Sequence, residues 1–275
     1  MNELEKYRGR DGIINLNRLN IELNDFNSFY YNGKKYYIKW SEKVLLLNEL
    51  VAAEIAKDFG IPSVSYDYAR FDFNAFYNGE CVISESAFKE NDKFYYLREI
   101  TGDNVTLEDI WNALENKYRD LDVVSILMDE IVNVFLFDIL IANDDRHGDN
   151  FCIVENEKGV HVAPLFDNEY LLCDNSIDFQ YYAMKVDSGN TYYRFVTQNL
   201  DRFLQISDER YLERLQSKLW IISSENLDSI FARIKMKTGL SLSEDYQEET
   251  KKGFEKNYNM IKDAIQRVNG KRKTV

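Results

Sequence analysis

The residues best suited to chemistry lie in a polar stretch that follows a long apolar run. This stretch reads Asn-Asp-Asp-Arg-His-Gly-Asp-Asn over residues 143–150, and a lone aspartate, Asp167, ends a later apolar segment. Asn150 follows Asp145 by five positions. At this spacing a carboxylate can orient an attacking hydroxyl, while the amide and a second carboxylate hold magnesium. The two segments therefore predict a phosphoryl-transfer site with Asp145 as the catalytic residue and Asn150 and Asp167 as metal ligands.

Two other kinds of site can be tested by counting along the same stretch. Aminoglycoside-type small-molecule kinases use His-Gly-Asp with an asparagine five positions after the aspartate, but the residue five positions after Asp149 is Val154. A calcium-binding EF-hand loop that starts at Asp145 would need Asp or Asn where His147 stands. The count favours Asp145 and keeps Asp149 as a secondary acid near the metal. We expect His147 to orient the loop through a hydrogen bond.

The composition indicates a globular protein with a strongly acidic surface. The chain has 275 residues, 45% of them hydrophobic, and only 12 Gly and 2 Pro. That is enough apolar material for one large domain or two small ones. The formal net charge of −13 repels nucleic-acid phosphates and disfavours a general DNA or RNA binder. A nucleotide site in such a chain must supply a cation of its own.

The cysteines and the apolar runs point to the cytoplasm. Cys81, Cys152 and Cys173 are odd in number and far apart, so we expect buried free thiols in a reducing compartment. The first ten residues have no apolar core of a signal peptide. The most apolar run, 134–142, contains an aspartate and is too short to span a bilayer, so we expect no membrane contact.

The first part of the chain carries the signals of a β-hairpin and a helix. Asn32-Gly33 favours a type I′ turn between strands over 26–31 and 34–40, because both central residues of that turn need positive φ. Apolar periodicity predicts a helix over 44–59. Lys39 lies near the end of the second strand, just ahead of this helix. A lysine in this place can pair with nucleotide phosphates and with a helix glutamate.

Glu49 and Glu54 are the two candidates for that glutamate. They are five residues apart on the predicted helix. Because that spacing separates them by about 140° around the helix axis, only one of them can face Lys39.

The remaining patterns predict a few more strands and then a mainly helical part. Residues 89–93 are the best candidate linker, and a ligand cleft is expected between the two parts. The expected segments are strands over 63–72 and 80–86, helices over 106–118 and 122–141, a hairpin over 151–166, a long loop over 168–190, and helices over 191–222, 225–238 and 244–268.

Together these motifs resemble the signature of the HipA-type kinases. That signature is N-x-D-x-H-x-x-N followed by P-x-[FY]-D. This chain has Asn143, Asp145, His147 and Asn150 in that order, followed by Pro164-Leu-Phe-Asp167. Tyr37-Ile-Lys39, Asn48-Glu49 and the helix end at Gly60-Ile-Pro62 are also similar to the nucleotide-binding lobe of that family, and the resemblance spans residues 30–270.

The resemblance implies a bilobal, protein-kinase-like fold of the α+β class. Residues 1–88 would form a small β-rich nucleotide-binding lobe, and residues 89–275 a larger, mainly helical catalytic lobe. Asp145 would be the catalytic base or position the acceptor hydroxyl, and Asn150 and Asp167 would bind Mg²⁺.

The resemblance also assigns the nucleotide contacts. Lys39, paired with Glu49, would bind the ATP phosphates, and Glu85 and Ser86 would belong to the hinge beside the adenine. Residues 13–59 contain a single glycine, Gly33, in the hairpin turn, so no glycine-rich loop covers the phosphates. Either other backbone amides cover the phosphates, or the site is weakened.

The implied activity is transfer of phosphate from Mg·ATP to Ser or Thr of a protein. Several HipA-type kinases are bacterial toxins, so the resemblance also suggests a toxin with an antitoxin partner, in a compact form without the extra N-terminal subdomain of HipA. A small-molecule kinase and a catalytically impaired nucleotide-binding or interaction module are the alternatives.

Overall fold

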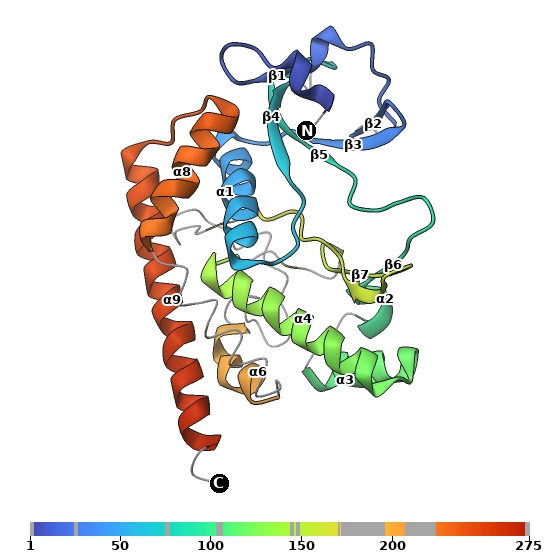
Figure 1. Ribbon diagram of the computed structural model, residues 1–275, viewed down its shortest axis with the longest axis vertical. Coiled ribbons are helices and arrows are strands. Elements are labelled where there is room, and N and C mark those ends of the chain that lie inside the picture. Colours follow the sequence, from blue (N-terminus) through green and yellow to red (C-terminus); the bar gives the residue numbers. More distant parts are fainter. Residues whose placement is uncertain are drawn as a thin grey trace.

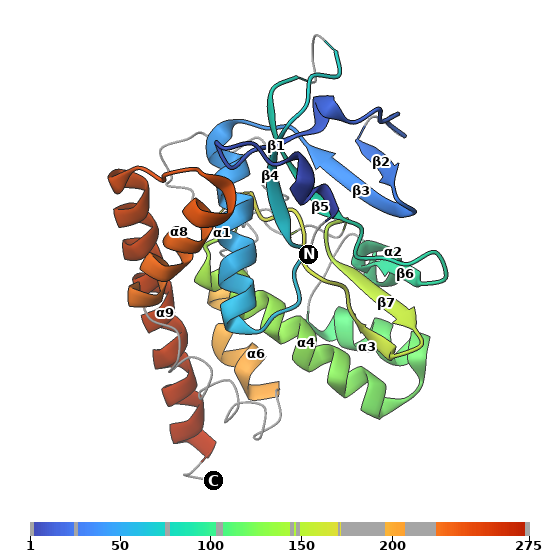
Figure 2. The same cartoon turned by 45° about the horizontal axis from the view of Figure 1, so that its top comes forward.

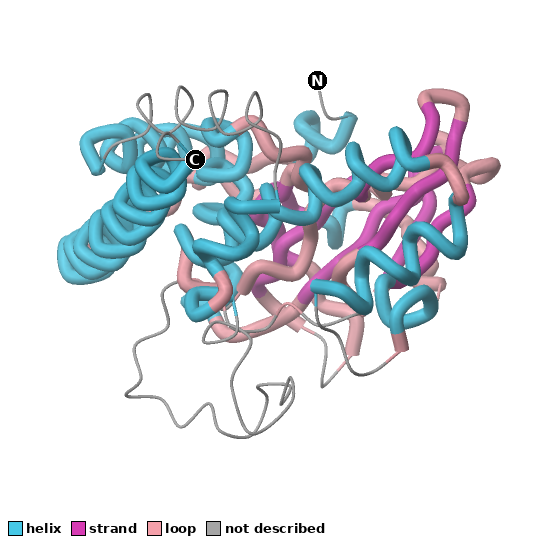
Figure 3. The backbone as a smooth tube through the Cα atoms, turned by 90° about the horizontal axis from the view of Figure 1, so that it is seen from below, coloured by secondary structure: helices cyan, strands magenta, loops and turns pink. Residues whose placement is uncertain are grey.

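The computed structural model shows two sheets and a set of helices packed beneath and beside them (Figure 1). Seen from below, the strands lie together on one side, and the long C-terminal helix projects on the other (Figure 3). The structure describes residues 3–24, 27–74, 78–102, 107–143, 146, 149–169, 171, 196–206 and 224–272.

A five-stranded sheet in the order β1-β4-β5-β3-β2 makes up the N-terminal part. The β1–β4 pair is parallel and the other pairs are antiparallel. The elements are η1 (Glu3–Tyr7), β1 (Ile14–Asn15), η2 (Leu16–Arg18), β2 (Ser28–Tyr31), β3 (Lys34–Lys39), β4 (Tyr66–Arg70) and β5 (Glu80–Glu85).

The β2–β3 hairpin forms as its turn residues predict. Asn32 and Gly33 have φ of 50° and 77°, so both central residues are in the left-handed region that a type I′ turn requires. Along β3, Tyr36 and Ile38 are buried, whereas Lys39 lies on the opposite face. The sheet therefore keeps Lys39 out of its own apolar core.

The predicted helix after the hairpin is α1 (Lys43–Phe59). Gly60 ends it with φ 74°, and its amide donates to the carbonyls of Ala56 and Lys57. α1 lies between the strands and α8 (Ser224–Thr238) (Figure 2). Because α1 packs against both the sheet and α8, its orientation is fixed by elements far apart in the sequence.

The rest of the described chain is mainly helical and contains a second, three-stranded antiparallel sheet in the order β6-β7-β8. Among the described residues, no helix is long and apolar enough to cross a membrane. The elements are β6 (Lys93–Tyr96), α2 (Leu97–Thr101), α3 (Leu107–Tyr118), α4 (Leu121–Leu140), β7 (Cys152–Asn156), β8 (Gly159–Val162), α6 (Leu200–Ile206) and α9 (Glu244–Arg272), besides α8.

The apolar helix predicted over 122–141 is α4, which is buried along most of its length. Asp120 caps its N-terminus by accepting from the amides of Asp122 and Val123. Beyond its C-terminus, Ala142 takes a positive φ of 48°, which turns the chain sharply into the polar stretch.

Other sequence predictions were wrong or lie partly outside the described residues. The polar stretch 89–93 leads directly into β6 and α2, two elements that the pattern did not predict. Of the loop expected over 168–190, the structure describes 168, 169 and 171, and of the helix expected over 191–222 it describes 196–206, which contains α6.

The largest hydrophobic core joins α1 to the helices of the C-terminal part. It includes residues of α1, α3, α4, α6, α8 and α9 together with Tyr66, Tyr68 and Val82 of the sheet. A smaller core fills the other face of the five-stranded sheet. One core thus crosses the boundary predicted between residues 88 and 89, and that boundary stays a prediction.

A close backbone contact joins the N-terminal loop to the turn between α8 and α9. Gly12 has φ 82° and Gly239 has φ 74°. A Cβ atom on Gly12 would lie 2.5 Å from the Thr238 carbonyl oxygen, and one on Gly239 would collide with the Asp11 carbonyl. Only glycine therefore fits at both positions.

Candidate functional site

Lys39 and three carboxylates form a charged cluster where the two parts of the chain meet. The ammonium of Lys39 lies 2.7 Å from Glu49 Oε1 and 3.1 Å from Glu169 Oε2, and it also contacts Asp167 Oδ1. Lys39 comes from β3, Glu49 from α1 and the two others from the segment after β8. Three residues predicted from the sequence, Lys39, Glu49 and Asp167, are therefore brought into direct contact.

Burial and charge act in opposite directions in this cluster. The Glu49 side chain is fully buried, whereas that of Lys39 is 27% exposed. Burial by itself lowers the pKa of Lys39, but the charges of Glu49, Asp167 and Glu169 raise it above its ordinary value. Burial raises the pKa of Glu49 although Lys39 opposes this effect. Lys39 is therefore positively charged throughout the physiological range.

The two candidate glutamates of α1 have separate partners. Glu49 faces Lys39, and its Oε2 accepts a hydrogen bond of 2.9 Å from the Asn168 amide. Glu54 turns away and forms an ion pair of 3.0 Å with Arg233 on α8. The helix geometry allowed only one of them to reach Lys39, and that residue is Glu49.

Asp167 is held by backbone contacts with the segment ahead of β4. The Leu165 amide donates to the Pro62 carbonyl at 2.8 Å, and the Val64 amide donates to the Leu165 carbonyl at 2.9 Å. Asp167 itself has φ 60°, and its amide donates to the Tyr66 hydroxyl at 3.3 Å. These contacts fix the segment that returns from the β7–β8 hairpin beside Lys39.

A buried arginine joins this segment to the polar stretch. The Arg146 side chain is 1% exposed and donates to both carboxylate oxygens of Asp138, at 3.2 and 3.0 Å. Its Nη1 donates to the Asn150 carbonyl at 3.2 Å and to the Phe166 carbonyl at 3.0 Å. Its Nη2 also contacts the amide oxygen of Asn168. One guanidinium thereby places Asn150 next to the residues around Asp167.

Sequence reasoning did not assign a role to Asp138 or Arg146. The available signal was Asp138, an acidic residue inside an otherwise apolar helix that had to be buried. A buried carboxylate needs a cation or several donors. Arg146 supplies the cation, and Asn143 adds a hydrogen bond of 3.0 Å to the same carboxylate.

The other residues predicted in the polar stretch have different outcomes. Asp145 and His147 lie outside the described residues, so their roles stay predictions. Asn150 is buried at 2% exposure. Asp149, kept as a secondary acid, forms an ion pair of 3.0 Å with Arg98 of α2.

The predicted hinge residues lie at the end of β5. Glu85 lines the cavity described below and forms an ion pair of 2.9 Å with Lys34. The hydroxyl of Ser86 donates to the Phe88 carbonyl at 3.1 Å and accepts from the Phe88 amide. Ser86 therefore shapes the chain locally, and contact with a nucleotide stays a prediction for both residues.

A cavity of about 400 Å³ opens above the charged cluster. This volume lies within the usual range for small-molecule sites, about 300–1,000 Å³. Residues from both parts of the chain line it. The lining residues are Asn27, Tyr37, Ile38, Lys39, Glu49, Val64, Tyr66, Val82, Ser84, Glu85, Ala87, Phe88, Tyr96, Phe166 and Asp167.

Asn27, just ahead of β2, is a candidate for covering phosphates, and sequence reasoning did not identify it. Asn27 lines the cavity, and its carbonyl accepts from the Ile38 amide at 2.7 Å. The next residue, Ser28, is 1% exposed and exchanges backbone hydrogen bonds of 2.6 and 3.0 Å with Asn24. Its hydroxyl also donates to the Asn24 carbonyl. These bonds hold the backbone at Asn27 beside the cavity without a glycine-rich sequence.

The residues at the cavity suit magnesium in the form expected for a phosphoryl-transfer site. Within the described ranges, no group of three or more His, Cys, Asp or Glu side chains forms a metal cluster by itself. Mg²⁺ in nucleotide sites takes one or two protein oxygen ligands and completes its shell with phosphate and water. Asp167 lines the cavity, and Arg146 links the backbone of Asn150 to that of Phe166, the neighbour of Asp167. Both side chains carry oxygen donors of the kind that Mg²⁺ takes, and their role as its ligands stays a prediction.

The thiols were expected to be buried and unpaired. Cys81 and Cys152 are buried free cysteines, as predicted, and Cys173 lies outside the described residues. Burial raises the pKa of both described thiols, that of Cys152 to about 12. Neither is suited to nucleophilic chemistry.

The two parts of the chain and the cavity between them have the arrangement of a kinase-like fold. A small sheet with one helix stands over a helical part, and a strand lysine pairs with a helix glutamate at the cavity between them.

Comparison with solved structures agrees with this class. The chain is similar to a proinflammatory kinase of Helicobacter pylori, CtkA, with a TM-score of 0.68 and 19% identity over 94% of this chain and 98% of that one. HipA of Shewanella oneidensis MR-1, in complex with HipB and operator DNA, matches with a TM-score of 0.46 and 14% identity over 88% of this chain and 64% of that one. No family model and no curated protein matches the sequence.

The likeness to CtkA covers nearly the whole chain and confirms the α+β, kinase-like fold predicted from the sequence.

Proposed function

We propose that this protein is a Mg·ATP-dependent phosphotransferase that phosphorylates Ser or Thr of a protein. The observation that carries the proposal is the contact of Lys39 with Glu49 and Asp167 at the wall of the cavity between the two parts. The three residues come from three distant segments of the chain. A surface lysine would not collect two such partners across a ligand-sized cavity.

The positions of the residues suggest a division of roles. The Lys39 ammonium would bind the phosphates of the nucleotide, and Glu49 would hold that ammonium in place. Asn150 and Asp167 would hold Mg²⁺, which neutralises charge that develops on the transferred phosphate. Asp145, next to Arg146 in the chain, would accept the proton of the acceptor hydroxyl. That the acceptor is a protein, and that an antitoxin partner binds this chain, are predictions from the sequence resemblance.

The test is transfer of label from radioactive ATP to proteins of a bacterial lysate. We expect transfer to fall by at least about 10²-fold in Asp145→Asn and Asp167→Asn, as when a group that stabilises the transition state is removed. Asp263→Asn, an exposed change on α9, is the matched control and should leave transfer unchanged. Undiminished transfer by folded Asp145→Asn and Asp167→Asn would rule out the assignment.

The same assay separates the alternatives. If Asp149→Asn abolishes transfer and Asp145→Asn does not, the register of the small-molecule kinases is correct. Label that appears in metabolites of the lysate instead of proteins would also favour a small-molecule kinase. Binding of Mg·ATP in a thermal shift assay, without transfer to any acceptor, would favour the catalytically impaired module.

A further inference from the structure

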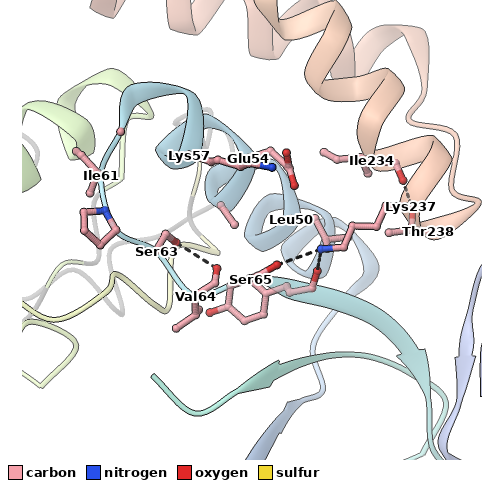
Figure 4. A pocket seen from close by; sticks show the side chains of 14 residues that line it. Leu50, Glu54, Lys57, Ile61, Ser63, Val64, Ser65, Ile234, Lys237 and Thr238 are labelled. Atoms are coloured by element: carbon pink, nitrogen blue, oxygen red, sulfur yellow. Dashed lines mark hydrogen bonds between the residues drawn. The ribbon is translucent and has the colours of Figure 1, made fainter. Parts of the chain in front are cut away.

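A second cavity, of about 620 Å³, lies beside α1 next to the first one. It is enclosed by α1, the segment from α1 to β4 and the C-terminal turns of α8, and Figure 4 shows its side chains converging from these elements. The lining residues are Leu50, Ala53, Glu54, Lys57, Gly60, Ile61, Pro62, Ser63, Val64, Ser65, Tyr66, Ile234, Lys237 and Thr238.

The two cavities share a wall. Val64 and Tyr66 line both of them. The Tyr66 hydroxyl accepts from the Asp167 amide. On α1, Glu49 lines the first cavity and Leu50, the next residue, lines the second. A molecule in the second cavity would therefore touch the elements that position Glu49 and Asp167.

The charges around the second cavity favour an anion. Arg233 contacts Glu54 at 3.0 Å and also Asp58, which does not line the cavity, at 2.8 Å. The Lys237 ammonium is held by the Tyr66 carbonyl at 2.6 Å, Ser65 Oγ at 3.2 Å and the carboxylate of Asp67 at 3.6 Å. Lys57 has no ion-pair partner among the described residues. In a chain with net charge −13, an unneutralised ammonium beside a cavity is a local site for negative charge.

Other lining residues supply an apolar surface and one more hydrogen-bond donor. Leu50, Ile61 and Ile234 are buried apolar residues of the floor and walls. Ser65 accepts from Lys237 through its oxygen, so its hydroxyl hydrogen is available to donate to a ligand. The lining thus combines apolar side chains with polar and charged ones, among them Ser63, Lys237 and Thr238, and such a mixed lining suits a ligand that is itself amphipathic.

We propose that this second cavity binds a small amphipathic monoanion, an apolar body with one carboxylate or sulfonate, and that its occupancy changes nucleotide binding at the first cavity. The anionic group lies toward Lys57 and Ser65, and the apolar body lies among Leu50, Ala53 and Ile234. The binding itself does not depend on the proposed function, whereas the coupling rests on it.

The coupling follows from the shared wall. A ligand that packs against Leu50 and Ala53 stabilises one position of α1, and with it the Glu49–Lys39 ion pair. A ligand against Tyr66 likewise stabilises the hydroxyl that holds the Asp167 amide. Since coupling between two sites is reciprocal, nucleotide must change the affinity for the anion by the same factor as the anion changes the affinity for nucleotide.

Binding is tested with 8-anilinonaphthalene-1-sulfonate, an apolar fluorophore with one negative charge. Fluorescence titration should show saturable binding to the native chain and at least a tenfold loss of affinity in Ala53→Trp, whose indole fills the cavity. Ala232→Trp is the matched control, since Ala232 is exposed on α8 and does not line the cavity. Equal binding by the Ala53→Trp protein would overturn the site.

A second pair of variants tests whether the cavity prefers a negatively charged ligand. Lys57→Glu should weaken binding of the fluorophore several-fold, while Lys158→Glu, an exposed change in the β7–β8 turn, should not. Octanoate should displace the fluorophore, and octylamine of the same chain length should not. Displacement by octylamine alone, or no effect of Lys57→Glu, would overturn the anion assignment.

Coupling is measured by repeating the titration with Mg·ATP present. The fluorophore's affinity should change at least about fivefold, the lower end of usual coupling between sites. An unchanged affinity in a protein that binds Mg·ATP in a thermal shift assay would overturn the coupling. A protein that binds the fluorophore but never Mg·ATP would overturn the proposed nucleotide site and the coupling, and would leave the anion site standing.

Discussion

The clusters around Lys39 and Arg146 are both ion pairs in the interior, yet they differ in balance and in access. Lys39 faces three carboxylates, remains 27% exposed and borders a cavity. Arg146 pairs with one carboxylate, that of Asp138, and both side chains are at most 1% exposed. The guanidinium of Arg146 also donates to the backbone carbonyls of Asn150 and Phe166.

This difference separates two tasks. The Lys39 cluster carries an excess of negative charge beside open space, which a metal ion or other cation can neutralise. The Arg146 cluster is balanced and closed, so a ligand gains nothing by entering it. We infer that the Lys39 cluster binds ligands and that the Arg146 cluster holds the ligand-binding residues in position.

Arg146→Met should have the largest effect on stability. It leaves Asp138 buried without its cation, and breaking a buried ion pair in this way costs about 3–5 kcal/mol. Urea unfolding should show this loss, whereas Arg233→Met at the partly exposed α1–α8 contact should cost about 1 kcal/mol or less. The double variant Asp138→Leu/Arg146→Met should recover part of the loss. A single-variant loss below that of Arg233→Met would refute the positioning role.

Lys39→Met should have a smaller effect that depends on pH. The change leaves Glu49 fully buried without a cation, so its pKa, already raised by burial from an ordinary 4.5, rises further. Because the pKa of Glu49 is raised in the folded state, the variant loses free energy of unfolding as the pH rises through the range above 4.5, where Glu49 ionises.

We therefore expect Lys39→Met to unfold near the native midpoint at acidic pH and to lose about 1–3 kcal/mol at pH 8, because the protein can offset part of the buried charge by protonation. Urea unfolding across this pH range measures the difference. Lys43→Met, at an exposed lysine, serves as control and should show no such trend. A loss that is constant with pH would contradict the role of Glu49.

Asp167→Asn should leave stability within about 1 kcal/mol of the native value in the absence of ligand, since it reduces an excess of negative charge and asparagine tolerates positive φ. Its thermal shift with Mg·ATP should disappear. Asp167→Ala should be less stable than Asp167→Asn, because alanine at φ 60° is strained. An undiminished Mg·ATP shift in Asp167→Asn would exclude Asp167 as a metal ligand.

Separating Arg98 from Asp149 should have the smallest effect. Their side chains are 42% and 46% exposed, and such surface pairs contribute about 0–1 kcal/mol. A double-mutant cycle with alanine at both positions should find a coupling energy in this range that vanishes at high salt. A coupling that salt does not affect would mean that this pair behaves like the buried Arg146 cluster.

Local signals predicted the parts of the fold that local chemistry determines. Asn32-Gly33 predicted the hairpin, and apolar periodicity predicted α1 and α4. Lys39 could be found from its place before a helix, and the choice between Glu49 and Glu54 needed the helix orientation, which α8 helps to determine.

The Arg146 cluster could not be predicted because its partners come from three separate segments. Nothing near Arg146 in the sequence indicates that its side chain turns inward to meet the Phe166 carbonyl. The backbone hydrogen bonds between Asn24 and Ser28 were missed for a related reason, since such bonds depend little on residue type. β6 was missed because it completes its sheet with β7, which lies more than fifty positions later.

The contact between Gly12 and Gly239 has a consequence for how the protein is made. The N-terminus of a chain leaves the ribosome first, so the contact between Gly12 and Gly239 cannot form until residue 239 has emerged. The β2–β3 hairpin and α1 can fold early from local interactions, but α1 stays without its α8 neighbour until then. The Glu54–Arg233 ion pair between α1 and α8 is therefore expected to form late in synthesis, after the partners of Lys39 and Glu49 have emerged.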